Sequence, residues 1–135
     1  MTLRTSARHG CLIVEMPREV DISNAEPLRQ ELRDVCRTLL EPASHDRPTA
    51  VVVDWSAAPF LTIAGVAVLD DFRRQAGTHG VPVRVVVSRR WPRAVLRMVG
   101  LNSLLAIHDT VEEALAGDEP SRDSQGRPET GRATP

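Results

Sequence analysis

The chain has 135 residues, a formal net charge of −1 at pH 7, and a composition that is 41% apolar and 26% charged. This length allows one domain with a single core and is too short for two ordinary domains. The near-neutral charge and the 3% aromatic content argue against direct nucleic acid binding, because neither a basic field nor a stacking platform is expected. All 17 basic residues are arginine, which excludes lysine-dependent chemistry such as a Schiff base or a Walker A phosphate grip.

The sequence predicts a cytoplasmic protein. No apolar run approaches the roughly 20 residues that span a bilayer, so no membrane insertion is expected. The apolar run after the first ten residues is shorter than the roughly 7–15 residues of a signal peptide's apolar region, so no signal peptide is expected. Cys11 and Cys36 fall in a predicted strand and a predicted helix, which favours buried free thiols in a reducing compartment. The histidines lack metal-ligand spacing and no glycine-rich phosphate loop is present, so no metal or cofactor is expected.

The first half of the chain predicts two strands, a helix and a third strand. Residues 12–16 form a short apolar strand, and residues 2–7 are its predicted antiparallel partner across a turn. Ser23 and Glu26 have the spacing of a capping box and predict the start of a helix. The apolar face of that helix is predicted at Leu28, Leu32, Val35 and Leu39. Residues 50–55 read as a strand that is buried on both faces, because three valines follow one another.

The second half predicts three further helices and two further strands. Thr62 precedes a helix over residues 63–75, and a strand follows at residues 83–87. A third helix ends at Gly100, and residues 104–107 are the last predicted strand. Thr110 and Glu113 form a second capping box before a short final helix that ends at Gly117.

The order β-β-α-β-α-β-α-β-α predicts a single α/β domain with a mostly parallel sheet. From Asp118 onward the composition becomes polar and rich in Ser, Asp, Arg, Gly and Pro. We therefore predict a domain over residues 1–117 and a disordered C-terminal tail over residues 118–135.

Four segments carry a resemblance to a known family. They are residues 18–21 (Arg-Glu-Val-Asp) before the first helix, 51–56 (Val-Val-Val-Asp-Trp-Ser), 60–65 (Phe-Leu-Thr-Ile-Ala-Gly), and the apolar stretch within 93–105. In this order they resemble a STAS domain, the fold of bacterial anti-sigma factor antagonists. The resemblance covers about residues 10–117 and implies a mixed sheet of four or five strands, with about four helices packed mainly on one side.

The segment before the second helix departs from the family's pattern. In regulated members a kinase-type anti-sigma factor phosphorylates the second serine of an Asp-Ser-Ser-Gly loop. Here Thr62, Ile63, Ala64 and Gly65 occupy those positions, so only the glycine is kept. Ala64 is a degenerate phosphosite because alanine has no hydroxyl. Thr62 is read first as a helix N-cap, and second as an alternative phosphoacceptor.

The resemblance implies protein binding rather than catalysis. It indicates an anti-sigma factor antagonist-like protein that binds a cytoplasmic anti-sigma factor, of serine kinase type or another type, and so regulates sigma-factor-dependent transcription. Two alternatives remain at this point: a STAS subunit associated with a lipid-trafficking ABC transporter, and a small enzyme or nucleotide-binding α/β protein. The expected partner-binding residues are Arg18, Asp21, Ser23, Asn24, Thr62, Ile63, Ala64 and Gly65.

Three further features have two interpretations each. The basic run at Arg84, Arg89, Arg90, Arg93 and Arg97 is either a solvated helix face, which is favoured, or a contact for an acidic partner or a phosphate. Trp91 within it is either an exposed anchor or a cover for the sheet edge. Asp21 and Asp54 read as a loop residue and a strand-end residue in preference to a catalytic acid/base pair.

Overall fold

The computed structural model describes residues 3–41 and 47–117, and the tail expected over residues 118–135 lies outside them. The strands are β1 (Arg4–Arg8), β2 (Cys11–Glu15), β3 (Ala50–Asp54), β4 (Val83–Val86) and β5 (Ala106–His108). The helices are α1 (Ala25–Leu39), α2 (Ile63–Thr78), α3 (Arg90–Met98), the 3-10 helix η1 (Leu101–Ser103) and α4 (Val111–Leu115). The predicted alternation of strands and helices is therefore confirmed.

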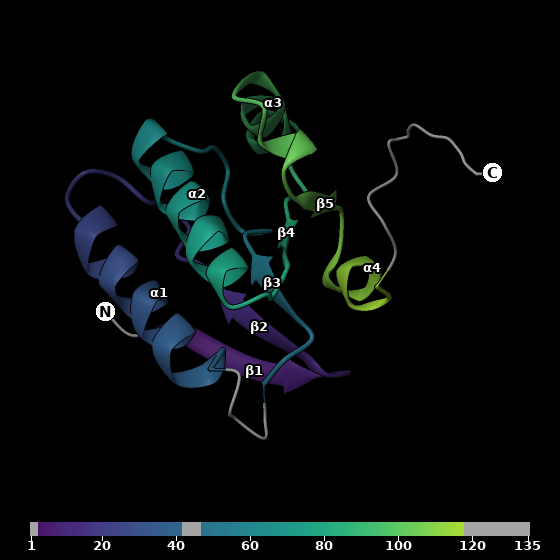
Figure 1. Ribbon diagram of the computed structural model, residues 1–135. Helices are drawn as coiled ribbons and strands as arrows, with labels where there is room; N and C mark the ends of the chain where they lie inside the picture. The colour runs from purple at the N-terminus through teal and green to yellow at the C-terminus, as the bar shows by residue number, and fades with distance from the viewer. Residues whose placement is uncertain (1–2, 42–46, 118–135) are drawn as a thin grey trace.

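The five strands form one mixed sheet in the order β1-β2-β3-β4-β5 (Figure 1). Strand β1 is antiparallel to β2, and β2 to β5 are parallel neighbours. The hairpin turns at His9 and Gly10, which both have positive φ angles, as a two-residue turn between twisted strands requires. Because the other four strands run in one direction, the loops that follow them all leave from the same edge of the sheet.

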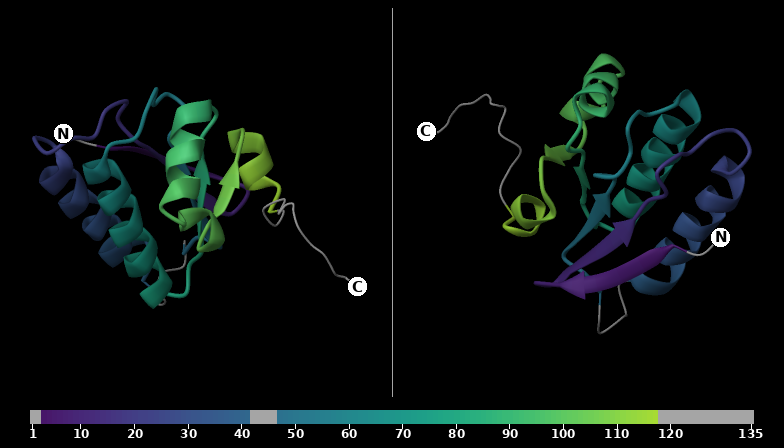
Figure 2. Two further views of the ribbon diagram at one scale, coloured as in Figure 1. Left: turned by 90° about the horizontal axis from the view of Figure 1, so that it is seen from above. Right: turned by 180° about the vertical axis from the view of Figure 1, so that it is seen from behind.

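Helices α1 and α2 lie side by side on one face of the sheet, and α4 covers the other face (Figure 2). Strand β3 is buried on both faces: Val51 and Val53 belong to the core under α1 and α2, and Val52 to the smaller core under α4. This double burial explains the run of valines in the sequence. The expectation of helices mainly on one side is confirmed.

The predicted capping box at the start of α1 is wrong. Helix α1 begins at Ala25, and its N-cap Asn24 makes no side-chain capping hydrogen bond. The Ser23 hydroxyl is donated to the carboxylate of Asp21 instead, and Glu26 contacts side chains further along α1. In a capping box the Ser23 oxygen would accept from a backbone N–H of the helix, whereas here the hydroxyl donates to a carboxylate two residues away. Because a hydrogen bond to an ionised acceptor is stronger than one between neutral groups, the local turn prevails.

Two other predicted boundaries shift. The sequence pattern predicts Leu39 as the last buried residue of the apolar face of α1, but Leu39 is partly exposed. Leu40, just beyond the end of the helix, is fully buried instead. Leu104 is exposed and belongs to the turn after η1, where its N–H donates to the carbonyl of Leu101 (2.9 Å). Strand β5 therefore begins only at Ala106. The apolar pattern alone did not distinguish this 3-10 turn from a strand.

Candidate functional site

The loops after β2 and β3 lie against each other at the carboxyl edge of the sheet. Their parent strands are parallel neighbours, and the Met16 N–H donates to the Asp54 carbonyl (3.0 Å) where the two strands end. The first loop runs over residues 16–24 and leads into α1, and the second runs over residues 55–62 and leads into α2. The sheet topology therefore brings together the two segments that the sequence singled out.

The Trp55 side chain connects the two loops from within the core. Its side chain is fully buried in the main core directly after β3. Its indole N–H donates to the Pro17 carbonyl (3.2 Å), which lies 38 residues away in the sequence. This hydrogen bond satisfies the polar group of a buried tryptophan and fixes the first loop at the same time.

Thr62 makes the second connection between the loops. Its hydroxyl oxygen accepts a hydrogen bond from the Gly65 N–H (3.0 Å), which confirms the N-cap interpretation. The same hydroxyl donates to the carbonyl of Val20 in the first loop. Both hydrogen-bonding functions of the side chain are therefore in use, and the residue is half-buried.

The turn before α1 is organised by its own side chains. The Asp21 carboxylate accepts hydrogen bonds from the Ser23 hydroxyl (2.5 Å) and the Ser23 N–H (2.9 Å). Asn24 accepts from the Asp21 N–H (2.8 Å) and donates to the Glu19 carbonyl (2.9 Å). The hydrogen bonds from Ser23 hold the pKa of Asp21 below its usual range, so this exposed carboxylate is charged at neutral pH.

Apolar side chains project from both loops into solvent. Ile22 is 93% exposed and Ile63 is 90% exposed, and Phe60 is also exposed. The Thr62–Val20 hydrogen bond joins the two chain segments within two residues of each isoleucine. We call this region, formed by residues 18–24, 60 and 62–64, the loop surface. An exposed apolar cluster beside charged and polar groups is typical of a protein-binding surface.

The residues expected at the site included Ile63 but did not single out Ile22 or Phe60. The available signal for Ile22 was its position as a single apolar residue within the polar turn Asp21 to Asn24. Of the residues expected at the site, Arg18, Asp21, Ser23 and Ile63 are exposed and Asn24, Thr62 and Ala64 are half-buried. Gly65 lies beneath the loop surface and is buried.

Gly65 packs against Trp55 within the first turn of α2. A Cβ atom built there would lie 3.3 Å from Cη2 of the Trp55 ring and 3.4 Å from the Thr62 hydroxyl oxygen. We expect Gly65→Lys to lower the free energy of unfolding by about 2 kcal/mol, because the fully buried ring has no room to shift. Gly65→Ala is the matched control and should cost less, since it adds only the Cβ atom and its better helix propensity offsets part of the tighter contact. Urea denaturation measures both, and a lysine variant as stable as the alanine variant would contradict the packing argument.

The acidic side chains of the site belong to local turns. Asp54 accepts hydrogen bonds from the hydroxyl (2.7 Å) and the N–H (3.1 Å) of Ser56, so Asp54 and Asp21 each serve a separate local turn. Within residues 3–41 and 47–117, no group of three or more His, Cys, Asp or Glu side chains is arranged to hold a metal ion. Burial, with a further contribution from the charge of Asp71, raises the pKa of Cys36 to about 11. Its thiol is therefore a core group rather than a nucleophile.

The basic run divides into internal and exposed arginines. Arg84 donates to the Ala114 carbonyl (2.7 Å) and so holds α4 on the sheet. Arg93 pairs with Asp109 (2.5 Å) and donates to the Val87 carbonyl (3.0 Å). Arg89, Arg90 and Arg97 are exposed, as is Trp91, which therefore does not cover the sheet edge.

The comparison with protein families agrees with this architecture. Residues 2–114 match the STAS domain model. The chain belongs to the STAS domain family. In the part of the chain that the structure describes, no helix is long and apolar enough to cross a membrane.

The similar proteins are bacterial. The anti-sigma-F factor antagonist RsfB of Mycobacterium tuberculosis is 27% identical over 120 residues, which cover 87% of this chain and 88% of that protein. The crystal structure of an anti-sigma factor antagonist from Mycobacterium paratuberculosis has 25% identity and a TM-score of 0.71, over 86% of this chain and 92% of that one. The Bacillus cell fate determinant SpoIIAA in its phosphorylated form shares the fold, with 16% identity and a TM-score of 0.57 over 86% and 98% of the two chains.

Proposed function

We propose that this STAS domain protein is a cytoplasmic, non-enzymatic antagonist that binds an anti-sigma factor through the loop surface. Sequestering the anti-sigma factor would release its sigma factor, so the protein would regulate transcription indirectly. RsfB and the protein of the mycobacterial crystal structure are both named as anti-sigma factor antagonists. Their names support an anti-sigma factor as the partner, rather than a role as a subunit of a lipid-trafficking ABC transporter. The absence of lysine argues against the nucleotide-binding alternative.

The observation that carries the proposal is the exposure of Ile22 and Ile63 on two loops joined by hydrogen bonds. The loops are fixed by Trp55 and Thr62, so the surface requires little ordering on binding. The charged groups of Arg18 and Asp21 beside the isoleucines provide a polar rim around the apolar contact.

The proposal is tested by titrating the full chain with an anti-sigma-F factor of the kind that RsfB antagonises. Isothermal titration calorimetry should detect a one-to-one complex with a dissociation constant of about 1 μM or tighter. An anti-sigma factor that binds RsfB under the same conditions but gives no heat with this chain would contradict the assignment of this partner.

We further propose that the interaction is independent of phosphorylation. Ala64 has no hydroxyl, and the Thr62 hydroxyl is engaged with Val20 and Gly65 inside the structure. Phosphorylating Thr62 would remove the proton that its hydroxyl donates to the Val20 carbonyl, and so would break the hydrogen bond that joins the two loops. Thr62 is therefore better placed as a structural cap than as a phosphoacceptor.

This proposal predicts no change in mass when the protein is incubated with a kinase-type anti-sigma factor, ATP and Mg²⁺. Intact-mass spectrometry makes the measurement, and a serine-containing antagonist verifies that the kinase is active. We expect the triple variant Thr62→Asp, Ile63→Ser, Ala64→Ser to be phosphorylated more readily than Ala64→Ser, because the single variant keeps the bulky Ile63 beside the new hydroxyl. A phosphate on the unmodified sequence that disappears in Thr62→Val would show that Thr62 is a working acceptor.

A further inference from the structure

A second group of exposed apolar side chains lies on α3 and η1, the two helices between β4 and β5. Trp91 is 71% exposed and Met98 is 82% exposed, and Val99 and Leu104 are more than half exposed. In all the views α2 lies between α1 and α3, so α3 is not part of the pair formed by α1 and α2 (Figures 1 and 2). We call the exposed side chains of Arg89, Arg90, Trp91, Arg97, Met98, Val99 and Leu104 the α3 surface.

The exposed side chains of α3 form two adjacent stripes. Trp91 and Met98 are seven residues apart, which is two helical turns, so they lie on one face of the helix. Arg90 and Arg97 have the same spacing and lie one position before Trp91 and Met98. The opposite face carries the buried side chains that hold α3 to the core, Pro92 and Leu96. The packing of the helix therefore does not use the tryptophan or the methionine.

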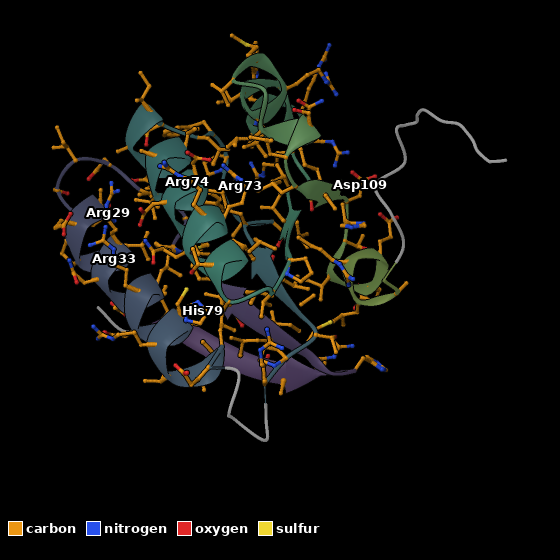
Figure 3. All side chains as sticks on the ribbon, in the orientation of Figure 1. Arg29, Arg33, Arg73, Arg74, His79 and Asp109 are labelled. Carbon is orange, nitrogen blue, oxygen red and sulfur yellow. The ribbon has the colours of Figure 1, made fainter. Side chains whose placement is uncertain are left out.

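The arginines of the α3 surface differ in their ion pairing from the arginines of α1 and α2. Five arginines on α1 and α2 form ion pairs with carboxylates of the same two helices: Arg29, Arg33, Arg37, Arg73 and Arg74. Figure 3 labels four of them, Arg29 and Arg33 on α1 and Arg73 and Arg74 on α2. Arg89, Arg90 and Arg97 form no ion pair within residues 3–41 and 47–117. The sequence has no Asp or Glu from residue 72 to residue 108. This part of the chain thus presents unneutralised positive charge beside exposed apolar area.

We propose that the α3 surface is a second docking site, which binds a protein segment that carries acidic and apolar side chains together. Trp, Met and Arg are the residue types enriched at the cores of protein interfaces. Carboxylates on the partner would neutralise the arginines, and its apolar side chains would cover Trp91 and Met98. An amphipathic helix with acidic residues beside its apolar stripe has this chemistry. The site is independent of the loop surface and does not rest on the function proposed above.

Two other occupants fit less well. In a two-fold symmetric dimer of this chain, the α3 surface would face its own copy and bring arginines of like charge together. An anionic membrane would attract the arginines, but the chain as a whole has a net charge of −1, which opposes binding to an anionic surface.

The test begins by panning a phage-displayed library of random peptides on the immobilised full-length protein. Fluorescence anisotropy then measures the affinity of the enriched peptides for the protein in solution. We expect enriched peptides to combine Asp or Glu with apolar residues at helical spacing. Trp91→Ala and the double variant Arg90→Glu, Arg97→Glu should each weaken their binding by about tenfold or more. Thr78→Asp, at the C-terminal end of α2, is the matched control and should leave it unchanged, while thermal melts followed by circular dichroism verify that each variant is folded.

Three results would overturn the proposal. The first is that no enriched peptide loses affinity for the α3 variants. The second is that the peptides that do lose affinity lack Asp and Glu. The third is binding to vesicles of phosphatidylglycerol and phosphatidylcholine that is lost in Trp91→Ala, in the absence of peptide binding, since this would assign the surface to a membrane. None of these results depends on an anti-sigma factor, so failure here is distinguishable from failure of the proposed function.

Discussion

Replacing Trp55 with alanine is expected to lower the free energy of unfolding by about 4 kcal/mol, since the side chain is fully buried and its removal leaves a large cavity. The substitution also removes the indole N–H that binds the Pro17 carbonyl, so the loop of residues 16–24 loses its connection to the core. Gly65 in the first turn of α2 would lose the ring against which it packs. The effect should therefore include both lower stability and a disordered loop surface.

Urea denaturation followed by circular dichroism measures the stability, and hydrogen exchange measures the order of residues 16–24. Trp55→Phe is the control, because it keeps much of the apolar volume and lacks the N–H. It should cost less than the alanine variant and still increase exchange in the loop, since the half-buried Pro17 carbonyl is left without its donor. An alanine variant with unchanged exchange in residues 16–24 would show that Trp55 does not hold the first loop.

Replacing Ile63 with aspartate is expected to weaken binding to the anti-sigma factor by about 30-fold or more, which is the scale of an interface hot spot. Ile63 is 90% exposed, so the substitution removes an apolar contact without removing core volume. It also places a negative charge in the contact, and burying that charge without a compensating partner costs binding free energy. Folding should be unaffected, because no packed side chain of the protein depends on Ile63.

Ile22→Asp should have an effect of the same kind, since Ile22 projects from the other loop of the same surface. Thr78→Asp, at the far end of α2, is the matched control and should bind as the unmodified protein does. Calorimetric titration distinguishes the three variants. If Ile22→Asp and Ile63→Asp bind as tightly as Thr78→Asp, the partner uses another surface, and the loop surface is not the site of contact.

The sequence by itself determined the features that depend on neighbouring residues. The valine run of β3, the turn at His9 and Gly10, and the cap at Thr110, whose hydroxyl accepts from the Glu113 N–H (3.1 Å), all involve groups within a few positions of each other. The absence of a hydroxyl at Ala64 is likewise a property of the residue itself. Such features follow from side-chain shape and local hydrogen bonding, so they can be read without the fold.

The tertiary structure alone decided which side chains are free to meet a partner. The Thr62–Val20 and Trp55–Pro17 hydrogen bonds join residues 42 and 38 positions apart, and no local pattern encodes such pairs. The exposure of Ile22 and Trp91 and the burial of Gly65 depend in the same way on elements distant in the sequence. Burial is set by what the whole fold places around a residue, and an apolar residue in a sequence does not reveal whether it faces the core or the solvent.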